Sequence, residues 1–370
     1  CNVLAMLNEM GKKTAFIGKV GKDQFGKLLR NTLNDIGIDT SNLFTDSTVN
    51  TTLAFVHTFP DGDREFSFYR NPGADMMLTE DEINTTFISQ AKIFHFGTLS
   101  MTQDSVRAAT KKAVKAAKES GVLISFDPNL REPLWSSLEL AKEQMNYGFS
   151  QCDILKISDN EIQFVTGKED YDEGIRCLQE KYQIPLILLT MGKEGSRAYY
   201  KGMRVECSGF SVKTIETTGA GDTFMGSVLN YLLEHDFNNL TEKQLEELLK
   251  LANAAAAIVT TRKGVIRAKA LGRAVIKVKV KYIPKGKKKA VTKTLKCKVT
   301  VPSVKKKTTA NKPEVTPTPA QTPAQTPAQT PKKTASPAES PTPTPAVYGK
   351  PGEIAAYNTC LLYTSDAADE

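Results

Sequence analysis

Residues 214–224 read TIETTGAGDTF, and this stretch decides how the fold of the chain is interpreted. Asp222 follows two glycines and precedes an apolar helical stripe made of Met225, Val228, Leu229, Leu232 and Leu233. A helix N-terminus presents unpaired N–H groups and a partial positive charge, so it attracts anions. Glycine lets backbone or phosphate approach closely because it has no side chain. The stretch therefore predicts an anion site at the start of a helix.

Two interpretations of Asp222 follow from this position. A transferring phosphoryl group could rest on neighbouring N–H groups while the Asp222 carboxylate accepts the proton of an attacking hydroxyl. Alternatively, Asp222 only caps its helix. The spacing by itself leaves both interpretations open.

Strand and helix patterns alternate along most of the remaining chain up to residue 268. Helical spacing predicts helices over 104–120 and 245–260, and short apolar runs predict strands at 93–96, 122–126, 154–157 and 186–189. Strands that alternate with helices indicate a mostly parallel sheet covered on both faces. We therefore predict an α/β fold.

Polar side chains follow three of these strands: Asp127, Asn129, Arg131, Ser158, Glu161 and Thr190. In open α/β sheets the carboxyl ends of the strands form the edge at which ligands bind. Each residue could be a turn or a cap, but three strand ends in succession favour a shared site. His95 lies inside an apolar strand and is predicted to be a hydrogen-bonded core residue. Asn253 is either a ligand contact or a polar flank of its helix.

The N-terminal part shows a different pattern. Residues 21–37 predict a turn and a helix with Asp23 as its N-cap. Residues 51–69 alternate apolar and polar side chains around a Pro-Asp-Gly-Asp turn, which predicts a β-hairpin without a helix on its outer face. A loop over residues 70–75 follows.

The net charge of +8 arises in the C-terminal part of the chain. Residues 269–370 contain 19 Lys and Arg against 6 Asp and Glu, so the body before them is mildly acidic, and we expect no nucleic-acid partner. No apolar stretch is long enough to span a bilayer, so we expect no membrane partner. The six cysteines lack CxxC spacing, which favours free thiols in a reducing cytoplasm over a zinc site.

The C-terminal part divides by composition. Residues 269–303 predict a lysine-faced β-hairpin of unrelated origin, similar to strands of Ig-like bacterial surface modules. Residues 304–359 are rich in Pro, Thr, Ala and Lys, which indicates a disordered linker, and residues 360–370 resemble translated sequencing-adapter DNA. We expect a chimeric chain joined near Ala268. This tail alone supports an alternative function as a non-catalytic cell-surface or cell-wall-binding protein.

Residues 217–224 resemble the second signature of the ribokinase-like (PfkB) carbohydrate kinases, and the resemblance covers essentially all of residues 1–268. Residues 18–26 are similar to the family's GxVGxDxFG stretch, and residues 190–195 to its TxGxxG nucleotide loop. Cys1-Asn2-Val3 resembles the end of its GG-x-x-x-N signature. The resemblance implies a ribokinase-like three-layer α/β/α fold with a small β-lid, the hairpin at about 51–70.

This family transfers a phosphoryl group from ATP to a sugar hydroxymethyl group with the help of Mg²⁺. The resemblance implies that Asp222 is the base, and that Gly219, Ala220 and Gly221 form the anion hole with it. It places the nucleotide at Thr190, Gly192, Gly195, Ser158 and Asn253, and the metal at Glu161.

Residues 70–75 and 127–131 most resemble bacterial fructokinases, so we expect D-fructose as the substrate. The expected sugar contacts are Arg70, Asn71, Asn129 and Arg131. Ribose, 2-keto-3-deoxygluconate and nucleosides stay open as alternative substrates within the family. The resemblance also implies a cytoplasmic enzyme and a homodimer formed through the lid.

Several features depart from the family pattern. Ser158 stands where the NxxE motif has asparagine, which leaves the metal role of Glu161 open. Glu216 stands where other members have aspartate near a monovalent-cation site, which leaves dependence on K⁺ open. The family's first strand, with its sugar-binding aspartate, would precede Cys1. We therefore expect the polypeptide as written to bind sugar poorly.

Overall fold

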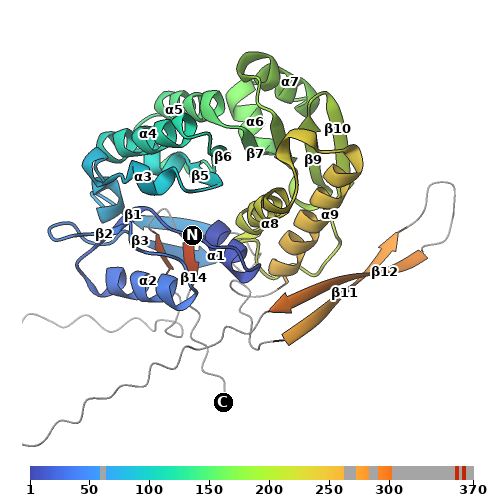
Figure 1. The fold of residues 1–370 in the computed structure, drawn as a ribbon, viewed down its shortest axis with the longest axis horizontal. Helices are drawn as coiled ribbons and strands as arrows, with labels where there is room; N and C mark the ends of the chain where they lie inside the picture. Colours follow the sequence, from blue (N-terminus) through green and yellow to red (C-terminus); the bar gives the residue numbers. More distant parts are fainter. Residues whose placement is uncertain (59–63, 262–271, 283–290, 302–354, 358–360, 364–370) are drawn as a thin grey trace, which may run out of the picture. The chain divides into compact units, whose positions relative to one another are not determined.

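The computed structural model describes residues 1–58, 64–261, 272–282, 291–301, 355–357 and 361–363 of the 370-residue chain. Its central feature is a six-stranded sheet with the order β10-β9-β8-β7-β6-β5 (Figure 1). These strands are β5 (Ile93–Gly97), β6 (Leu123–Asp127), β7 (Ile154–Ser158), β8 (Leu186–Thr190), β9 (Gly195–Tyr200) and β10 (Met203–Ser208). β5 to β8 pair in parallel, and β9 and β10 continue the sheet antiparallel. The predicted mostly parallel α/β sheet is confirmed.

Helices cover both faces of this sheet (Figure 1). They include α1 (Asn2–Glu9), α4 (Asp104–Glu119), α5 (Leu138–Gln151), α6 (Asp159–Thr166), α7 (Tyr171–Tyr182), α8 (Ala220–Glu234) and α9 (Glu242–Val259). Side chains of α4, α5 and α7 form one hydrophobic cluster with the sheet, and those of α1, α8 and α9 form a second. β8 contributes Ile187 and Leu189 to the first cluster, but Leu186 and Leu188 to the second. Because successive strand residues point to opposite faces, this division identifies a three-layer α/β/α arrangement.

Shorter helices connect these elements. They are α3 (Thr85–Ile88) and the 3₁₀ turns η1 (Ala74–Met77), η2 (Glu80–Glu82), η3 (Thr98–Met101), η4 (Glu132–Leu134), η5 (Gly192–Glu194) and η6 (Phe237–Asn239). The predicted helices over 104–120 and 245–260 correspond to α4 and α9, with ends that differ by at most three residues. The four strands predicted from apolar runs correspond to β5, β6, β7 and β8.

The N-terminal part builds a smaller cluster beside the first two strands. β1 (Gly18–Gly21) pairs in parallel with β2 (Leu43–Asp46), and α2 (Gln24–Asp35) packs with them through Leu29 and Leu33. Asp23 is the N-cap of α2, since its Oδ1 accepts the N–H of Gly26 at 2.8 Å. The prediction of Asp23 as a cap is therefore confirmed.

The predicted hairpin at 51–69 is present. β3 (Leu53–Thr58) and β4 (Arg64–Tyr69) pair antiparallel, from Leu53 opposite Tyr69 to Thr58 opposite Arg64. The predicted turn falls largely on residues 59–63, which lie outside the described residues. β4 forms one edge of a four-stranded sheet with the order β14-β13-β3-β4.

The C-terminal part contributes four strands. β11 (Gly272–Tyr282) and β12 (Val291–Val301) pair antiparallel, within the stretch predicted as a hairpin. β13 (Ala355–Tyr357) pairs with β3 and with β14 (Leu361–Tyr363), so two short strands lie where we predicted none. A strand edge offers backbone N–H and C=O groups that pair with an extended segment whatever its composition. Most of the predicted linker and of the predicted adapter-derived end falls outside the described residues.

Two expectations from composition can be compared with the structure. Cys152, Cys177 and Cys207 are free thiols, whereas Cys1 is disulfide-bonded, which corrects the expectation for Cys1. Spacing along the chain does not reveal which thiols the fold brings together. Within the described residues, none of the helices combines the length and apolar character needed to span a bilayer.

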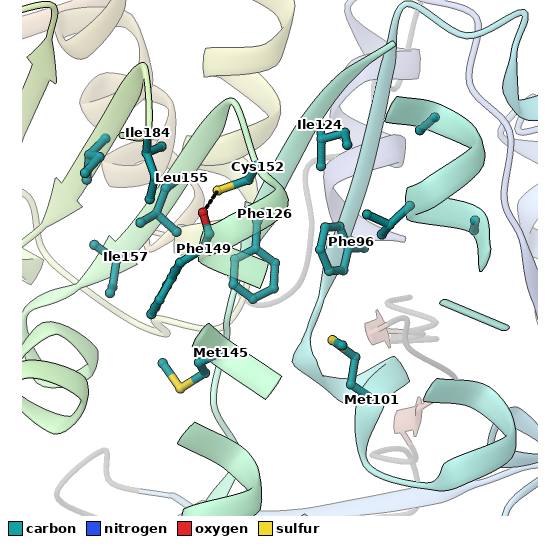
Figure 2. Packing of buried hydrophobic residues seen from close by; sticks show 14 of the residues in the cluster. Phe96, Met101, Ile124, Phe126, Met145, Phe149, Cys152, Leu155, Ile157 and Ile184 are labelled. Carbon is teal, nitrogen blue, oxygen red and sulfur yellow. Dashed lines mark hydrogen bonds between the residues drawn. The ribbon is translucent and has the colours of Figure 1, made fainter. Parts of the chain in front are cut away.

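The core of the first cluster depends on a glycine in α5. A Cβ atom at Gly148 would lie 2.3 Å from two ring carbons of Phe126. The Phe126 ring is fully buried between Phe96 and Phe149, with ring centroids 4.7 and 5.8 Å away (Figure 2). The ring therefore has no free space into which it can move.

We predict that Gly148→Ala lowers the free energy of unfolding by ~1–3 kcal/mol, the usual cost of overpacking a core. The better helix propensity of alanine, worth up to ~1 kcal/mol, opposes this loss without cancelling it. Urea unfolding measures the difference. Ser150→Ala, an exposed change in the same helix, is the control and should stay within ~0.5 kcal/mol. A Gly148→Ala variant as stable as the unchanged chain would contradict the packing described here.

Candidate active site

The N-terminus of α8 presents backbone donors without acceptors. Gly219 is the N-cap and has a φ of 77°, in the left-handed region that favours glycine. The N–H of Ala220 donates to the Thr217 carbonyl at 3.2 Å and is used by the turn. In the part of the chain that the structure describes, the N–H groups of Gly221 and Asp222 have no acceptor. These two amides, next to the Asp222 carboxylate, can receive an anion.

Asp222 is held in place by the first helix. Its Oδ2 accepts a hydrogen bond from Nδ2 of Asn2 at 2.8 Å. The two helices approach closely because α8 has a glycine at the contact: a Cβ at Gly226 would lie 2.8 Å from Cβ of Met6. The hydrogen bond from Asn2 leaves the second carboxylate oxygen, Oδ1, for another partner.

Lys156 of β7 lies beside the anion site. Its ammonium is 3.1 Å from Oδ1 of Asp127 at the end of β6, and both residues are buried. Burial raises the pKa of Asp127 to about 6, and Glu161 and Asp222 add to the rise while Lys156 opposes it. Burial alone would lower the pKa of Lys156, but the Asp127 and Glu161 carboxylates outweigh it and hold this pKa above its usual value. Lys156 is therefore a buried cation whose charge interacts with several nearby carboxylates.

Glu161 ties two strand ends together. Its Oε2 accepts the N–H of Ser158 at 2.9 Å and the Ser158 hydroxyl at 2.8 Å, while Ser158 caps α6 in return. Its Oε1 accepts the N–H of Leu130 at 2.8 Å, which fixes the loop that carries Asn129 and Arg131. Ser158 in place of asparagine therefore forms a capping box with Glu161.

The residues expected at the nucleotide lie along neighbouring strands. Ser158 on β7 pairs with Thr190 on β8, and Thr190 pairs with Ser196 on β9. Ser196 donates its hydroxyl to Oδ1 of Asn253, whose Nδ2 donates to the Cys207 carbonyl at 3.0 Å. Asn253 thus joins α9 to β9 and β10. Both of these hydrogen bonds are structural, and the predicted nucleotide contact of Asn253 stays a prediction.

The two glycines of the predicted nucleotide loop both have positive φ, 53° at Gly192 and 115° at Gly195. A Cβ at Gly195 would lie 2.1 Å from the Cys207 carbonyl oxygen, so only glycine fits this turn. Met191 N–H donates to the Gly195 carbonyl at 2.9 Å and closes the loop. The loop is therefore preformed by its own backbone.

The residues expected to contact the sugar lie in two places. Arg70 follows β4 and donates to Asp75, to Thr102 and to the Leu99 carbonyl, and its side chain is only 6% exposed. Asn71 beside it is exposed. Asn129 has a φ of 47°, and Arg131 donates to the Leu130 carbonyl at 2.9 Å. Arg70 is thus anchored by several acceptors, whereas Asn71 is exposed and Asn129 is half-buried.

His95 lies near these charges as a neutral residue. Its Nδ1 is 2.9 Å from the Ser125 hydroxyl on the neighbouring strand β6. Burial lowers the pKa of His95 to about 4. The prediction of a hydrogen-bonded core histidine is confirmed.

Two residues of this site were not singled out from the sequence. Lys156 interrupts the apolar run of β7, and a lysine within a strand that is covered on both faces is a signal in the sequence that points to it. Asn2 was noted only as part of a signature, and its contact with Asp222 spans 220 positions along the chain.

The carboxylates suit a magnesium ion that arrives with phosphate. Among the described residues, no three His, Cys, Asp or Glu side chains gather closely enough to hold a metal by themselves. Glu161 Oε2 accepts two donors, but Oε1 accepts one and keeps a lone pair. Mg²⁺ in kinases is held by one or two carboxylates, waters and substrate phosphates. Glu161 fits such a shared site.

The chain matches the pfkB family carbohydrate kinases over residues 1–270. It belongs to this family. The family relationship agrees with the donors at the start of α8, with the Asp222 carboxylate beside them, and with the strand-end residues described above.

Curated and solved relatives include fructokinases. The chain is 42% identical over 267 residues to probable fructokinase-2 of Arabidopsis thaliana. The aligned residues cover 72% of this chain and 81% of that protein. The fructokinase of Vibrio cholerae, solved with fructose, ADP and calcium, is similar with a TM-score of 0.65 and 32% identity, over 71% of this chain and 84% of that one. A double mutant of the same fructokinase, with fructose, ADP and potassium bound, is similar with a TM-score of 0.64 and 32% identity. This match also covers 71% of this chain and 84% of that one.

His95 gives this pfkB kinase a pH dependence of stability. The fold favours neutral imidazole, whereas an unfolded histidine takes up a proton near pH ~6.5. The free energy of unfolding should therefore fall as the pH drops from ~6.5 through about 4, by ~2–3 kcal/mol from this residue.

We predict that the unchanged chain loses ~2–3 kcal/mol more than His95→Gln does between pH 7 and pH 4. Urea unfolding of both proteins at several pH values measures this, and the other titrating groups cancel in the comparison. Parallel pH profiles for the two proteins would show that His95 is not held neutral.

Proposed function

We propose that this chain is an ATP-dependent fructokinase that converts D-fructose and ATP into D-fructose 6-phosphate and ADP. The observation that carries the proposal is the start of α8, where the Gly221 and Asp222 amides have no acceptor among the described residues and lie beside the Asp222 carboxylate. The fructokinase relatives at 42% and 32% identity support fructose as the sugar. Ribose, 2-keto-3-deoxygluconate and nucleosides are the alternatives to be tested beside it.

The proposed reaction uses Asp222 as the base. The Asp222 carboxylate accepts the proton of the sugar hydroxyl as its oxygen forms a bond to the terminal phosphorus of ATP. The bond between that phosphorus and the bridging oxygen breaks, and ADP leaves with the electron pair. The Gly221 and Asp222 amides stabilise the negative charge on the transferring group, with Gly219 and Ala220 shaping the turn that presents them.

Other residues take supporting parts in this proposal. Ser158, Thr190 and Gly195 lie at the ends of paired strands, Gly192 lies in the turn between β8 and β9, and Asn253 of α9 is bonded to Ser196 of β9. These five residues are proposed to surround the nucleotide. Arg70, Asn71, Asn129 and Arg131 are proposed to contact the sugar. The buried bonds of Arg70 indicate that it orders the base of the lid while doing so.

The proposed cofactors are ATP and Mg²⁺. Glu161 would hold the ion together with the phosphates, and the ion would offset phosphate charge. Dependence on K⁺ is proposed from the potassium-bound relative and would be seen as a higher rate in potassium than in sodium buffer. A cytoplasmic location, where ATP is available, is part of the proposal, and cell fractionation tests it.

The base role of Asp222 yields a direct prediction. Asp222→Asn should lower kcat with fructose by roughly 10²–10⁴-fold, the usual contribution of general base catalysis, while ATP affinity changes little. ADP formation with a panel of sugars gives the rate, and titration calorimetry gives the affinity. Both measurements use the full chain.

Asp104→Asn is the matched control. Asp104 also lies in the first turn of a helix, α4, but its side chain is 97% exposed. It should leave the rate unchanged. If Asp222→Asn kept the full rate, another group would be the base. If the unchanged chain phosphorylated no sugar or nucleoside, the proposed function would be wrong.

We also propose a homodimer formed through the lid. β4 lies at one end of the strand order β14-β13-β3-β4, and the resemblance of this hairpin to the family's lid supports the proposal. Light scattering should give twice the 40.6 kDa mass of the chain. Phe68→Asp in β4 should shift the mass towards the monomer, whereas Asp104→Asn should not. A monomer at all concentrations tested would contradict this proposal.

A further inference from the structure

The Lys156 ammonium occupies a position next to the anion site. A Cβ atom at Gly221 would lie 3.3 Å from Nζ of Lys156, so the ammonium is in near contact with the backbone that presents the free amides. Lys156 comes from β7, and the amides come from α8. The ammonium from β7 and the amides from α8 thus lie at the same site.

The Lys156 ammonium has more N–H donors than it has acceptors among the described residues. An ammonium carries three N–H groups, and Asp127 Oδ1 accepts one of them at 3.1 Å. Among the described residues, no other acceptor lies within hydrogen-bonding distance of Nζ. The side chain is only 8% exposed, so bulk water does not easily satisfy the other two donors. A buried cation with free donors is costly unless a ligand completes its contacts.

The site also favours a ligand with negative charge. The Gly221 and Asp222 amides are donors, and the helix N-terminus carries a partial positive charge. Together with the ammonium they form a donor cluster of three groups. Such a cluster fits the non-bridging oxygens of a phosphoryl group, which accept several charge-assisted hydrogen bonds.

We propose that Lys156 is a catalytic residue that binds the terminal phosphoryl group of ATP, with Asp127 holding its ammonium ready before the nucleotide arrives. This inference rests on the proposed kinase function. The ammonium donates to an oxygen of the transferring group, beside the Gly221 and Asp222 amides. It remains protonated throughout, so the proton of the sugar hydroxyl still goes to Asp222.

The experiment compares the affinities of a nonhydrolysable ATP analogue and of ADP, which lacks the terminal phosphoryl group. The full chain and its variants are titrated with each nucleotide by calorimetry in the presence of Mg²⁺. Lys156→Met should weaken the analogue by ~10- to 100-fold, the loss expected for one charge-assisted hydrogen bond, and leave ADP within ~3-fold. Lys156→Arg, which keeps the positive charge, should recover part of the preference for the analogue.

Asp127→Asn is the matched control, because it breaks the same buried ion pair from the other side. If the pair were only structural, Lys156→Met and Asp127→Asn would weaken both nucleotides alike. Under the proposal, Asp127→Asn keeps the ammonium and therefore keeps the preference for the analogue. The two variants should thus differ in the ratio of the two affinities, which a general loss of stability does not change.

Several outcomes would overturn the proposal. An unchanged ratio of affinities in Lys156→Met would show that the ammonium does not contact the terminal phosphoryl group. If Lys156→Met does not fold, the double variant Lys156→Met/Asp127→Asn removes both charges, and the same loss is expected there. If the unchanged chain binds neither nucleotide, the proposed kinase function fails together with this inference. Binding with an unchanged ratio refutes the role of Lys156 alone.

Discussion

The unpaired N–H groups at the start of α8 are the constraint on which the rest of the structure depends. α8 is buried along most of its length between α1, α9 and the sheet, so its direction is fixed by packing. Its first turn must therefore lie where the fold places it, with Gly219 in a left-handed conformation and two amides without acceptors. The first N–H groups of a helix have no intrahelical acceptors, and a bound anion is one way to satisfy them.

The charges around this turn follow from the same constraint. Asp127, Glu161 and Asp222 come from three different elements, and the buried Lys156 interacts with all three. Burial raises the pKa of Asp127 to about 6, and Glu161 and Asp222 add to the rise while the single cation Lys156 opposes it. A phosphate accompanied by a divalent cation changes this balance by adding charges of both signs. The site is thus arranged for a metal–nucleotide complex more than for a bare anion.

The sequence allowed the main features of the fold and the centre of the site to be predicted. The apolar stripe of α8, the strands β5 to β8 and the N-cap Asp23 follow from local patterns, and local patterns were sufficient for them. The cluster of polar residues at strand ends was also predicted, because parallel strands bring their carboxyl ends to one edge. Ser158 and Glu161 form the capping box that their spacing allows.

Other features depend on contacts between distant parts of the chain. The hydrogen bond from Asn2 to Asp222 and the position of Lys156 beside Gly221 arise only when separate elements pack together. The same holds for Arg70, whose partners Thr102 and Leu99 lie about thirty positions away. The disulfide at Cys1 and the pairing of β13 with β3 likewise leave no local pattern in the sequence. Local periodicity reports which face of an element is buried, but it does not report what the element packs against.

A crystal structure of the chain with a nonhydrolysable ATP analogue and Mg²⁺ would test the central claim most directly. The account predicts that the terminal phosphoryl group accepts hydrogen bonds from the Gly221 and Asp222 amides, with the Asp222 carboxylate facing the side from which a sugar hydroxyl would attack. A terminal phosphoryl group bound away from the start of α8, with those two amides in contact only with water, would contradict it.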